Sequence, residues 1–245
     1  MTTKSTNKLK NLYDYLKPGQ PVRYESLAEL GISPDLAVYY AKSGWLKRLA
    51  NGVYVKPGHE LDLKSSIKLL ERNIEGLHVG GKTALQWRGI KHYIYFKNIT
   101  QMYGWNTSKL PEWFASEFTC DYHRKRIFTE EPERLLYTSD FGGTLGGPKT
   151  SEPERAILEM LDEVGVRQGL TEAREIMEGA LNLRSDVVME LLFKCTSVKT
   201  VRLFISLASE LNLPVYNEIK TERFPTGSSS NWVGHYKNFR LVLKP

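Results

Sequence analysis

The sequence predicts an α+β fold in two domains, and three features of the residue pattern support this. Residues 33–43 have the spacing and end signals of a short helix, and residues 45–55 follow at once as a short basic hairpin. Strand-like runs occupy the middle of the chain, and helix-like apolar periodicity dominates from residue 151. We expect residues 1–57 to form one domain and residues 58–245 a mixed α/β domain with a helical bundle.

Bulk composition places the chain among ordinary globular proteins. It has 245 residues, of which 41% are hydrophobic and 25% charged. No apolar run approaches the roughly 20 residues of a membrane span, and the N-terminus lacks the apolar segment of a secretory signal. Two cysteines, Cys120 and Cys195, do not form a disulfide framework or a metal site by spacing. We therefore predict a cytoplasmic protein with no membrane contact.

The first 57 residues contain three helix patterns and a hairpin. Residues 5–17 carry one apolar stripe, residues 24–30 form a second short helix, and Gly31 provides the tight turn after it. The third helix begins with Ser33 as N-cap and Pro34 in its first turn, and it ends at Gly44. Two strands then flank Asn51-Gly52, a dipeptide typical of hairpin turns. This order indicates a winged helix-turn-helix.

The third helix should bury one side and expose the other. Ala37, Tyr40 and Ala41 are expected to face inward, with Leu36 beside them. Asp35, Val38, Tyr39 and Lys42 then point outward. Tyr39 and Tyr40 are adjacent and cannot both be buried, so a rotation by one position would instead pack Tyr39 under the hairpin.

The positive charge of the chain is concentrated in the same segment. Residues 1–57 hold nine Lys or Arg and four Asp or Glu, a net charge of +5, whereas the remaining residues sum to +1. Such a concentration suits binding to phosphates, although a solvated basic face is the alternative. In a winged helix-turn-helix the N-terminal part of the third helix reads base edges in the major groove. The predicted contacts to double-stranded DNA are Ser33, Asp35, Tyr39, Lys42, Lys47, Arg48, Asn51 and Lys56.

Two motifs in the second domain resemble parts of enzyme sites. Residues 76–83, GLHVGGKT, match the phosphate-loop pattern, but no buried strand precedes them, so we expect Gly80-Gly81 to begin a helix instead. Glu218 and Lys220, on a strand predicted over 215–222, match half of a nuclease metal site whose aspartate cannot be placed. The five histidines lack ligand spacing. The prediction is therefore no catalytic residue, no cofactor and no metal.

The middle of the chain is rich in aromatic and basic residues. Its aromatic residues fit half-buried strands, and the alternative is a platform on which single-stranded nucleic acid stacks. Residues 123–126, HRKR, form the densest basic cluster. Arg124, Lys125 and Arg126 are candidates for a secondary contact to nucleic acid or to a partner, and a solvated hairpin is the alternative.

From residue 151 the pattern is mainly helical. Ser151 and Glu154 have the spacing of a capping box, and the apolar face after them includes Ile157 and Leu161. Three more amphipathic helices are expected over residues 171–181, 185–194 and 197–211, and a strand over residues 239–243.

Three sequence runs together resemble the AbiEi family of type IV antitoxins. They are SGWLKRLANGVYVKPG from residue 43, HVGGKTALQWRGI from residue 78 and SEPERAILEML from residue 151. The resemblance implies an N-terminal winged helix and a transcriptional regulator that represses its own operon through inverted repeats. It also implies neutralisation of a nucleotidyltransferase-like toxin without a stable complex. Inverted sites favour a homodimer on DNA.

Two other functional classes remain open from the sequence. One is a metal- or nucleotide-dependent nuclease that a winged helix directs to its target. The other is an adaptor that binds RNA or docks to a protein.

Overall fold

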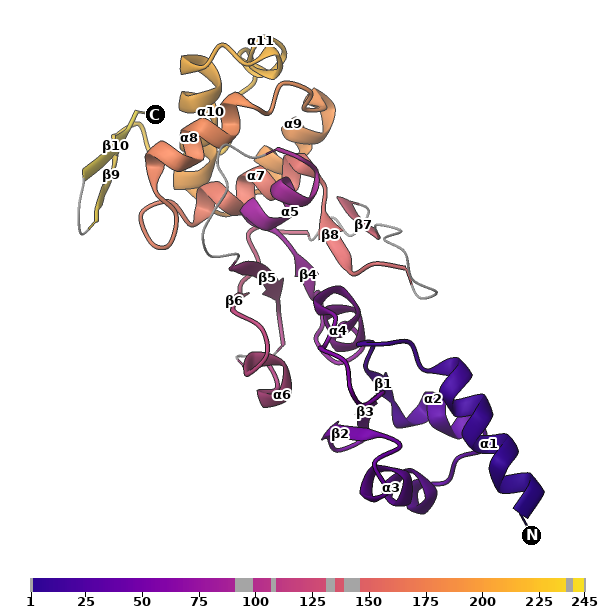
Figure 1. The fold of residues 1–245 in the computed structure, drawn as a ribbon. Helices are drawn as coiled ribbons and strands as arrows, with labels where there is room; N and C mark the ends of the chain where they lie inside the picture. Colours follow the sequence, from indigo (N-terminus) through magenta and orange to yellow (C-terminus); the bar gives the residue numbers. More distant parts are fainter. Residues whose placement is uncertain are drawn as a thin grey trace. The chain divides into compact units, whose positions relative to one another are not determined.

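The computed structural model describes residues 2–90, 99–106, 109–130, 135–138, 146–236 and 240–244 (Figure 1). It confirms the α+β class. Two compact units are present, one made of residues 1–75, 108–119 and 139–148, the other of residues 76–107, 120–138 and 149–245. The domain boundary after residue 57 stays a prediction. None of the described helices is long and apolar enough to cross a membrane.

The first unit contains the predicted three helices and hairpin. Its elements are α1 (Thr2–Tyr15), β1 (Val22–Arg23), α2 (Tyr24–Glu29), α3 (Pro34–Lys42), β2 (Lys47–Ala50), β3 (Val53–Val55), α4 (Leu63–Leu70) and α6 (Glu112–Ala115). The three strands form an antiparallel sheet in the order β1-β3-β2. A shared apolar core joins α1, α2, α3 and the sheet through Leu12, Leu16, Val22, Leu27, Ile32, Ala37, Tyr40, Leu46 and Tyr54.

Local signals set the ends of α3 and the hairpin turn. The Ser33 hydroxyl oxygen accepts a hydrogen bond from the Leu36 amide at 3.3 Å, and Pro34 occupies the first helical position, where no amide hydrogen is needed. Gly44, with φ of 77°, adopts the left-handed conformation that ends the helix. Gly52 supplies a φ of 70° at the hairpin turn. The predicted start and stop of this segment are confirmed.

The second unit contains a five-stranded mixed sheet. Its strands are β4 (His78–Val79), β5 (Thr100–Gly104), β6 (Cys120–Arg124), β7 (Leu136–Thr138) and β8 (Lys149–Ser151), in the order β6-β5-β4-β8-β7. The β5–β6 and β4–β8 pairs are parallel, and the other two pairs are antiparallel. The predicted strand over residues 92–96 lies outside the described residues.

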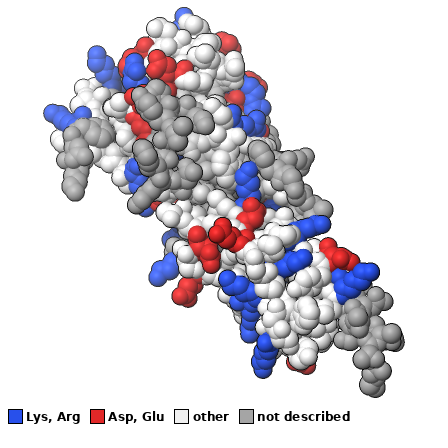
Figure 2. Space-filling view, viewed as in Figure 1, with Lys and Arg blue, Asp and Glu red and all other residues white. Residues whose placement is uncertain are grey.

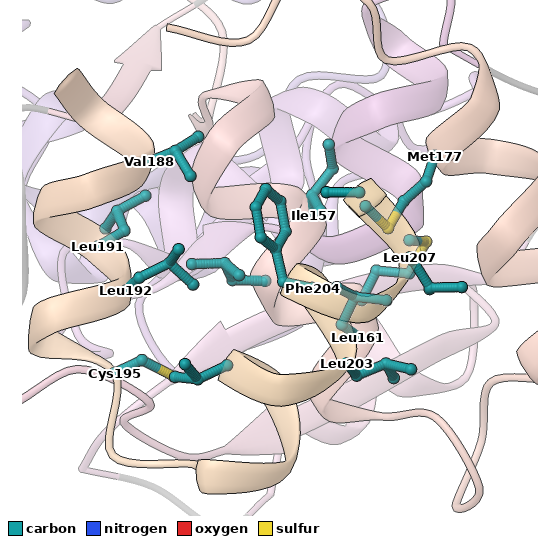
Figure 3. Packing of buried hydrophobic residues seen from close by; sticks show 14 of the residues in the cluster. Ile157, Leu161, Met177, Val188, Leu191, Leu192, Cys195, Leu203, Phe204 and Leu207 are labelled. Atoms are coloured by element: carbon teal, nitrogen blue, oxygen red, sulfur yellow. The ribbon is translucent and has the colours of Figure 1, made fainter. Parts of the chain in front are cut away.

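Helices α7 and α10 lie at the centre of the second unit's apolar core (Figure 3). Every residue from Glu154 to Asp162 on α7 is buried, including four charged side chains. The helices of this unit are α5 (Gly81–Trp87), α7 (Pro153–Asp162), α8 (Leu170–Glu178), α9 (Ser185–Lys194), α10 (Val198–Glu210) and α11 (Pro214–Ile219). The three amphipathic helices predicted after α7 are confirmed. A two-stranded hairpin, β9 (Trp232–His235) and β10 (Arg240–Leu243), completes the unit.

Two expectations for this unit were wrong. The strand predicted over residues 215–222 is helix α11, which begins at Pro214 and buries Val215 and Ile219, four residues apart on one face. Ser151 does not cap α7, because it lies in β8, and its hydroxyl donates to the Glu159 carboxylate at 2.9 Å.

Candidate nucleic-acid interface

Helix α3 presents one exposed stripe of side chains. Asp35 and Lys42 are exposed, Val38 is half-buried, and Tyr39 retains 61% of its accessible surface. Tyr40, in contrast, is 3% exposed. The predicted rotation of the helix is therefore confirmed, and the alternative with Tyr39 under the hairpin is wrong.

The N-terminus of α3 offers few free amide donors. Pro34 has no amide hydrogen, and the Leu36 amide donates to the Ser33 hydroxyl oxygen. The Ala37 amide donates to the Ser33 carbonyl at 2.9 Å. The Asp35 amide is therefore the one amide of this first turn for which no hydrogen bond is found within the described residues. The Ser33 hydroxyl proton remains available as a donor.

The hairpin carries its cations on exposed side chains. Lys47, Arg48 and Asn51 are all exposed. The Arg48 guanidinium donates to the Asn51 side-chain oxygen at 2.8 Å and to the Ala50 carbonyl at 3.3 Å. These bonds hold the guanidinium at the tip of the hairpin. Asn51 is thus a positioning residue for Arg48 as well as an exposed amide.

Aromatic rings hold the exit of the hairpin against α1. The Tyr13 and Trp45 rings pack edge to face with centroids 5.8 Å apart, and the Lys56 ammonium lies 4.6 Å from the Tyr13 centroid. Trp45 keeps 42% of its surface exposed. Tyr54 is buried in the hairpin, where it pairs with Arg48 across the two strands.

Basic side chains gather on this part of the surface. In the space-filling view, Lys and Arg side chains form a continuous run in the area of β2 and α3 (Figure 2). Lys42, Lys47, Arg48 and Lys56 belong to these elements or follow them directly, and Asp35 is the only acidic residue between positions 33 and 59. We call α3 together with the β2–β3 hairpin the basic face.

The HRKR cluster of the second unit is directed largely toward its own protein. His123 is 4% exposed, and its Nδ1 atom lies 3.3 Å from a Glu163 carboxylate oxygen. The Lys125 ammonium binds the Asp162 carboxylate and lies 3.8 Å from Glu163. Arg126 lies over the Trp105 ring at 4.3 Å. All three predicted contacts are exposed, but Arg124 alone among them has no side-chain hydrogen bond, ion pair or ring contact within the described residues, so it is best placed to meet another molecule.

The GLHVGGKT run does not form a phosphate loop. Strand β4 ends at Val79, Gly80 caps α5, and the Gly81 amide donates to the Glu159 carboxylate at 3.0 Å. The Lys82 amide donates to the Gln101 side chain at 2.8 Å. Groups of the protein itself therefore occupy the position that a bound phosphate would take. The expected role of Gly80-Gly81 as a helix start is confirmed.

Glu159 is the centre of a buried charged cluster. Its carboxylate accepts from Arg155 at 2.8 Å and from Ser151 at 2.9 Å, and it lies 2.9 Å from His78 Nε2. Burial raises the pKa of Glu159, but the charges and hydrogen bonds of His78 and Arg155 outweigh burial and lower that pKa to about 2. The carboxylate is therefore ionised at neutral pH and holds α5, α7 and β8 together.

The E-x-K pair lies on a helix, contrary to the prediction of a strand. On α11 and its C-cap, Glu218 and Lys220 are two positions apart, so they point to nearly opposite sides. The Glu218 carboxylate accepts a hydrogen bond from the Ser185 hydroxyl. Within the described part of the chain, no group of three or more His, Cys, Asp or Glu could hold a metal ion.

Comparison with protein families decides which class this architecture belongs to. Residues 97–244 match the family model described as "Transcriptional regulator, AbiEi antitoxin, Type IV TA system", and residues 5–96 match the model of the AbiEi antitoxin N-terminal domain. The chain belongs to the AbiEi antitoxin family. This family comprises transcriptional regulators and antitoxins of type IV toxin–antitoxin systems.

Other comparisons inform the fold. The crystal structure of the RV2827C protein from Mycobacterium tuberculosis is similar, with a TM-score of 0.60 and 16% sequence identity. The similarity covers 96% of this AbiEi chain and 89% of that chain, which shows that the two folds agree over nearly their full lengths. No curated protein matches the sequence.

Two features of the AbiEi chain were missed from the sequence. The Arg48–Asn51 contact has a local signal, since Asn51 is in the hairpin turn and Arg48 lies only three residues before it, and it could have been found. The buried partners of Glu159 could not, because His78 and Gly81 lie 81 and 78 residues away and nothing in their neighbourhood marks the pairing.

Proposed function

We propose that this AbiEi protein binds double-stranded DNA through the basic face and thereby represses its own operon. The observation that carries the proposal is the exposed stripe of α3 beside an exposed cationic hairpin. The stripe contains Asp35, Tyr39 and Lys42, and the hairpin contains Lys47, Arg48 and Asn51. A helix of this exposure fits the major groove, and a cationic hairpin beside it suits the phosphate backbone or the minor groove.

The remaining parts of the proposal follow from the family. Inverted repeats in the operator would be bound by two copies of the chain, since two-fold symmetric sites match a two-fold dimer. The partner gene product would be a nucleotidyltransferase-like toxin, which the antitoxin counteracts without a stable complex. No residue of the chain is assigned a catalytic role. Arg124, exposed at the end of β6, is the proposed secondary contact, with Lys125 and Arg126 committed mainly to Asp162 and Trp105.

The test measures binding of the full chain to a duplex that covers the region upstream of its reading frame. We expect Lys42→Ala with Arg48→Ala to abolish the gel shift at physiological salt while the thermal unfolding midpoint stays unchanged. Each phosphate contact adds about 0.9 to the slope of log K against log salt, so the double variant should lower that slope by roughly 2.

A matched control removes the same charge elsewhere. Lys220 and Arg223 are exposed in the second unit, and Lys220→Ala with Arg223→Ala should leave the gel shift intact. Equal losses of affinity in both double variants would show that net charge, and no particular face, controls binding. Unchanged affinity in the Lys42/Arg48 variant would refute the proposed interface.

A further inference from the structure

We propose that Asp35 is a specificity-determining residue that reads an amino group, cytosine N4 or adenine N6, in the major groove of the operator. The inference rests on the proposed function and names the chemistry of the base edge that the basic face selects. Its starting point is a single negative charge on a surface that is otherwise cationic. Residues 33–59 contain Lys42, Lys47, Arg48 and Lys56, and Asp35 alone opposes them.

The surroundings of Asp35 leave its carboxylate open to a ligand. The residue is exposed at the second position of α3, and no hydrogen bond or ion pair of its side chain is found within the described residues. The exposed acid Glu25, in contrast, pairs with Arg23 at 3.1 Å. The carboxylate of Asp35 is therefore not committed to a cation of the first unit.

The position of Asp35 matches a base edge better than a phosphate. It lies in the first turn of α3, the part of a recognition helix that contacts bases, and Tyr39 follows one turn later on the same face. A phosphate is disfavoured here because Pro34 has no amide hydrogen, the Leu36 amide is capped by Ser33, and the carboxylate repels an anion. A helix inserted into the groove would bring this carboxylate close to base edges.

Base chemistry then limits what the carboxylate can accept. An ionised aspartate has only acceptor oxygens, and the exocyclic amino groups of cytosine and adenine are the donors on the major-groove edge. Guanine O6 and N7 and thymine O4 are acceptors and would face the carboxylate without a hydrogen bond. Asp35 therefore favours some sequences and disfavours others, while it lowers affinity for DNA in general.

The experiment compares base preference in wild type, Asp35→Ala and Asp35→Asn, using selection from a random duplex library and the upstream duplex with single base-pair changes. The wild type should prefer cytosine or adenine at one position in each half-site, with a discrimination of roughly 5- to 150-fold. Asp35→Ala should lose that preference and bind unrelated duplexes more tightly. Asp35→Asn should shift the preference toward adenine, whose N6 and N7 suit an amide.

The matched controls are Asp14→Ala and Asp14→Asn, since Asp14 is exposed on α1 in the same unit. They should leave the base preference as in wild type. A role of Asp35 limited to stabilising the start of α3 would lower the thermal unfolding midpoint without changing which base is selected, and that result overturns the inference. If the wild-type protein binds no duplex at all, that result would refute the proposed function. The proposal that Asp35 reads a base would then fail as well.

Discussion

Lys42 at the end of α3 and Lys125 just after β6 are the same residue type in two regions with different surroundings. Lys42 is exposed and belongs to a surface where four cations meet one acid. Lys125 binds the buried carboxylate of Asp162, and Glu163 lies 3.8 Å away. The density of Lys and Arg in the sequence therefore does not by itself identify a binding surface. What matters is whether the fold supplies an internal partner.

The largest expected effect comes from breaking the internal charges of the second unit. Glu159→Ala removes the carboxylate that Arg155, 2% exposed, and His78 both contact, and breaking a buried ion pair from one side is strongly destabilising, so we expect a loss of about 3–5 kcal/mol in the free energy of unfolding. Urea denaturation would measure this. Glu159→Gln, which keeps the volume and some hydrogen bonds, should lose less. A loss below about 1 kcal/mol for Glu159→Ala would contradict the central role of this cluster.

Lowering the pH should destabilise the fold of the second unit before that of the first unit. Burial raises the pKa of Glu163, but the hydrogen bond and charge of His123, with Lys125 and Arg167, lower it to about 2, close to the value for Glu159. A carboxyl whose pKa is lower in the folded state stabilises the fold above its unfolded pKa, about 4.5, and loses that contribution as pH falls toward 2.

The measurement is hydrogen exchange of individual peptides between pH 5 and pH 3, corrected for the intrinsic exchange rate. Peptides of α7 should lose protection over this range more than peptides of α2 and α3. Equal loss in both units would show that the buried carboxyls do not control acid stability.

Lys125→Ala sharpens the comparison because it should affect stability and leave DNA binding unchanged. Removing the ammonium leaves the Asp162 carboxylate, 5% exposed, without this cation. We therefore expect the free energy of unfolding to fall by about 1–2 kcal/mol. Arg124→Ala, at a neighbouring exposed position, is the control and should leave stability unchanged. A tenfold loss of duplex affinity in folded Lys125→Ala protein would place this cluster in the DNA interface.

The smallest effect should come from a surface ion pair of the first unit. Arg23 and Glu25 lie 3.1 Å apart with 26% and 62% of their side chains exposed. Exposed pairs contribute little to stability, so Glu25→Ala should leave the thermal unfolding midpoint nearly unchanged. Comparing the thermal unfolding midpoints of Glu25→Ala and Glu159→Ala would test the contrast between the units directly. A similar decrease of the midpoint in both variants would contradict that contrast.

The sequence predicts the first unit better than the second because its signals are local. The start of α3 depends on Ser33 and Pro34, its end on Gly44, and the turn on Gly52, all within one or two residues of the feature that they determine. Even the outward side of α3 follows from helical spacing, as the exposure of Tyr39 and the burial of Tyr40 show. Which exposed residues contact DNA is a different question, and it remains a prediction.

The sequence did not predict those features of the second unit that depend on contacts between residues far apart in the chain. The run from Pro214 to Ile219 contains Val, Tyr and Ile, which favour strands, yet packing of Val215 and Ile219 on the core makes it α11. Lys125 finds Asp162 only because β6 lies beside the end of α7, 37 residues further along. Such contacts depend on tertiary structure and leave no periodic signal.

Hydrogen exchange of the full chain with and without the upstream duplex tests the central claim most directly. If the basic face binds DNA, new protection on DNA binding is concentrated in peptides covering residues 33–56, and the protection of peptides covering α7 to α10 is unchanged. Protection confined to residues 120–126, or absent from residues 33–56 while the duplex is bound, would contradict it.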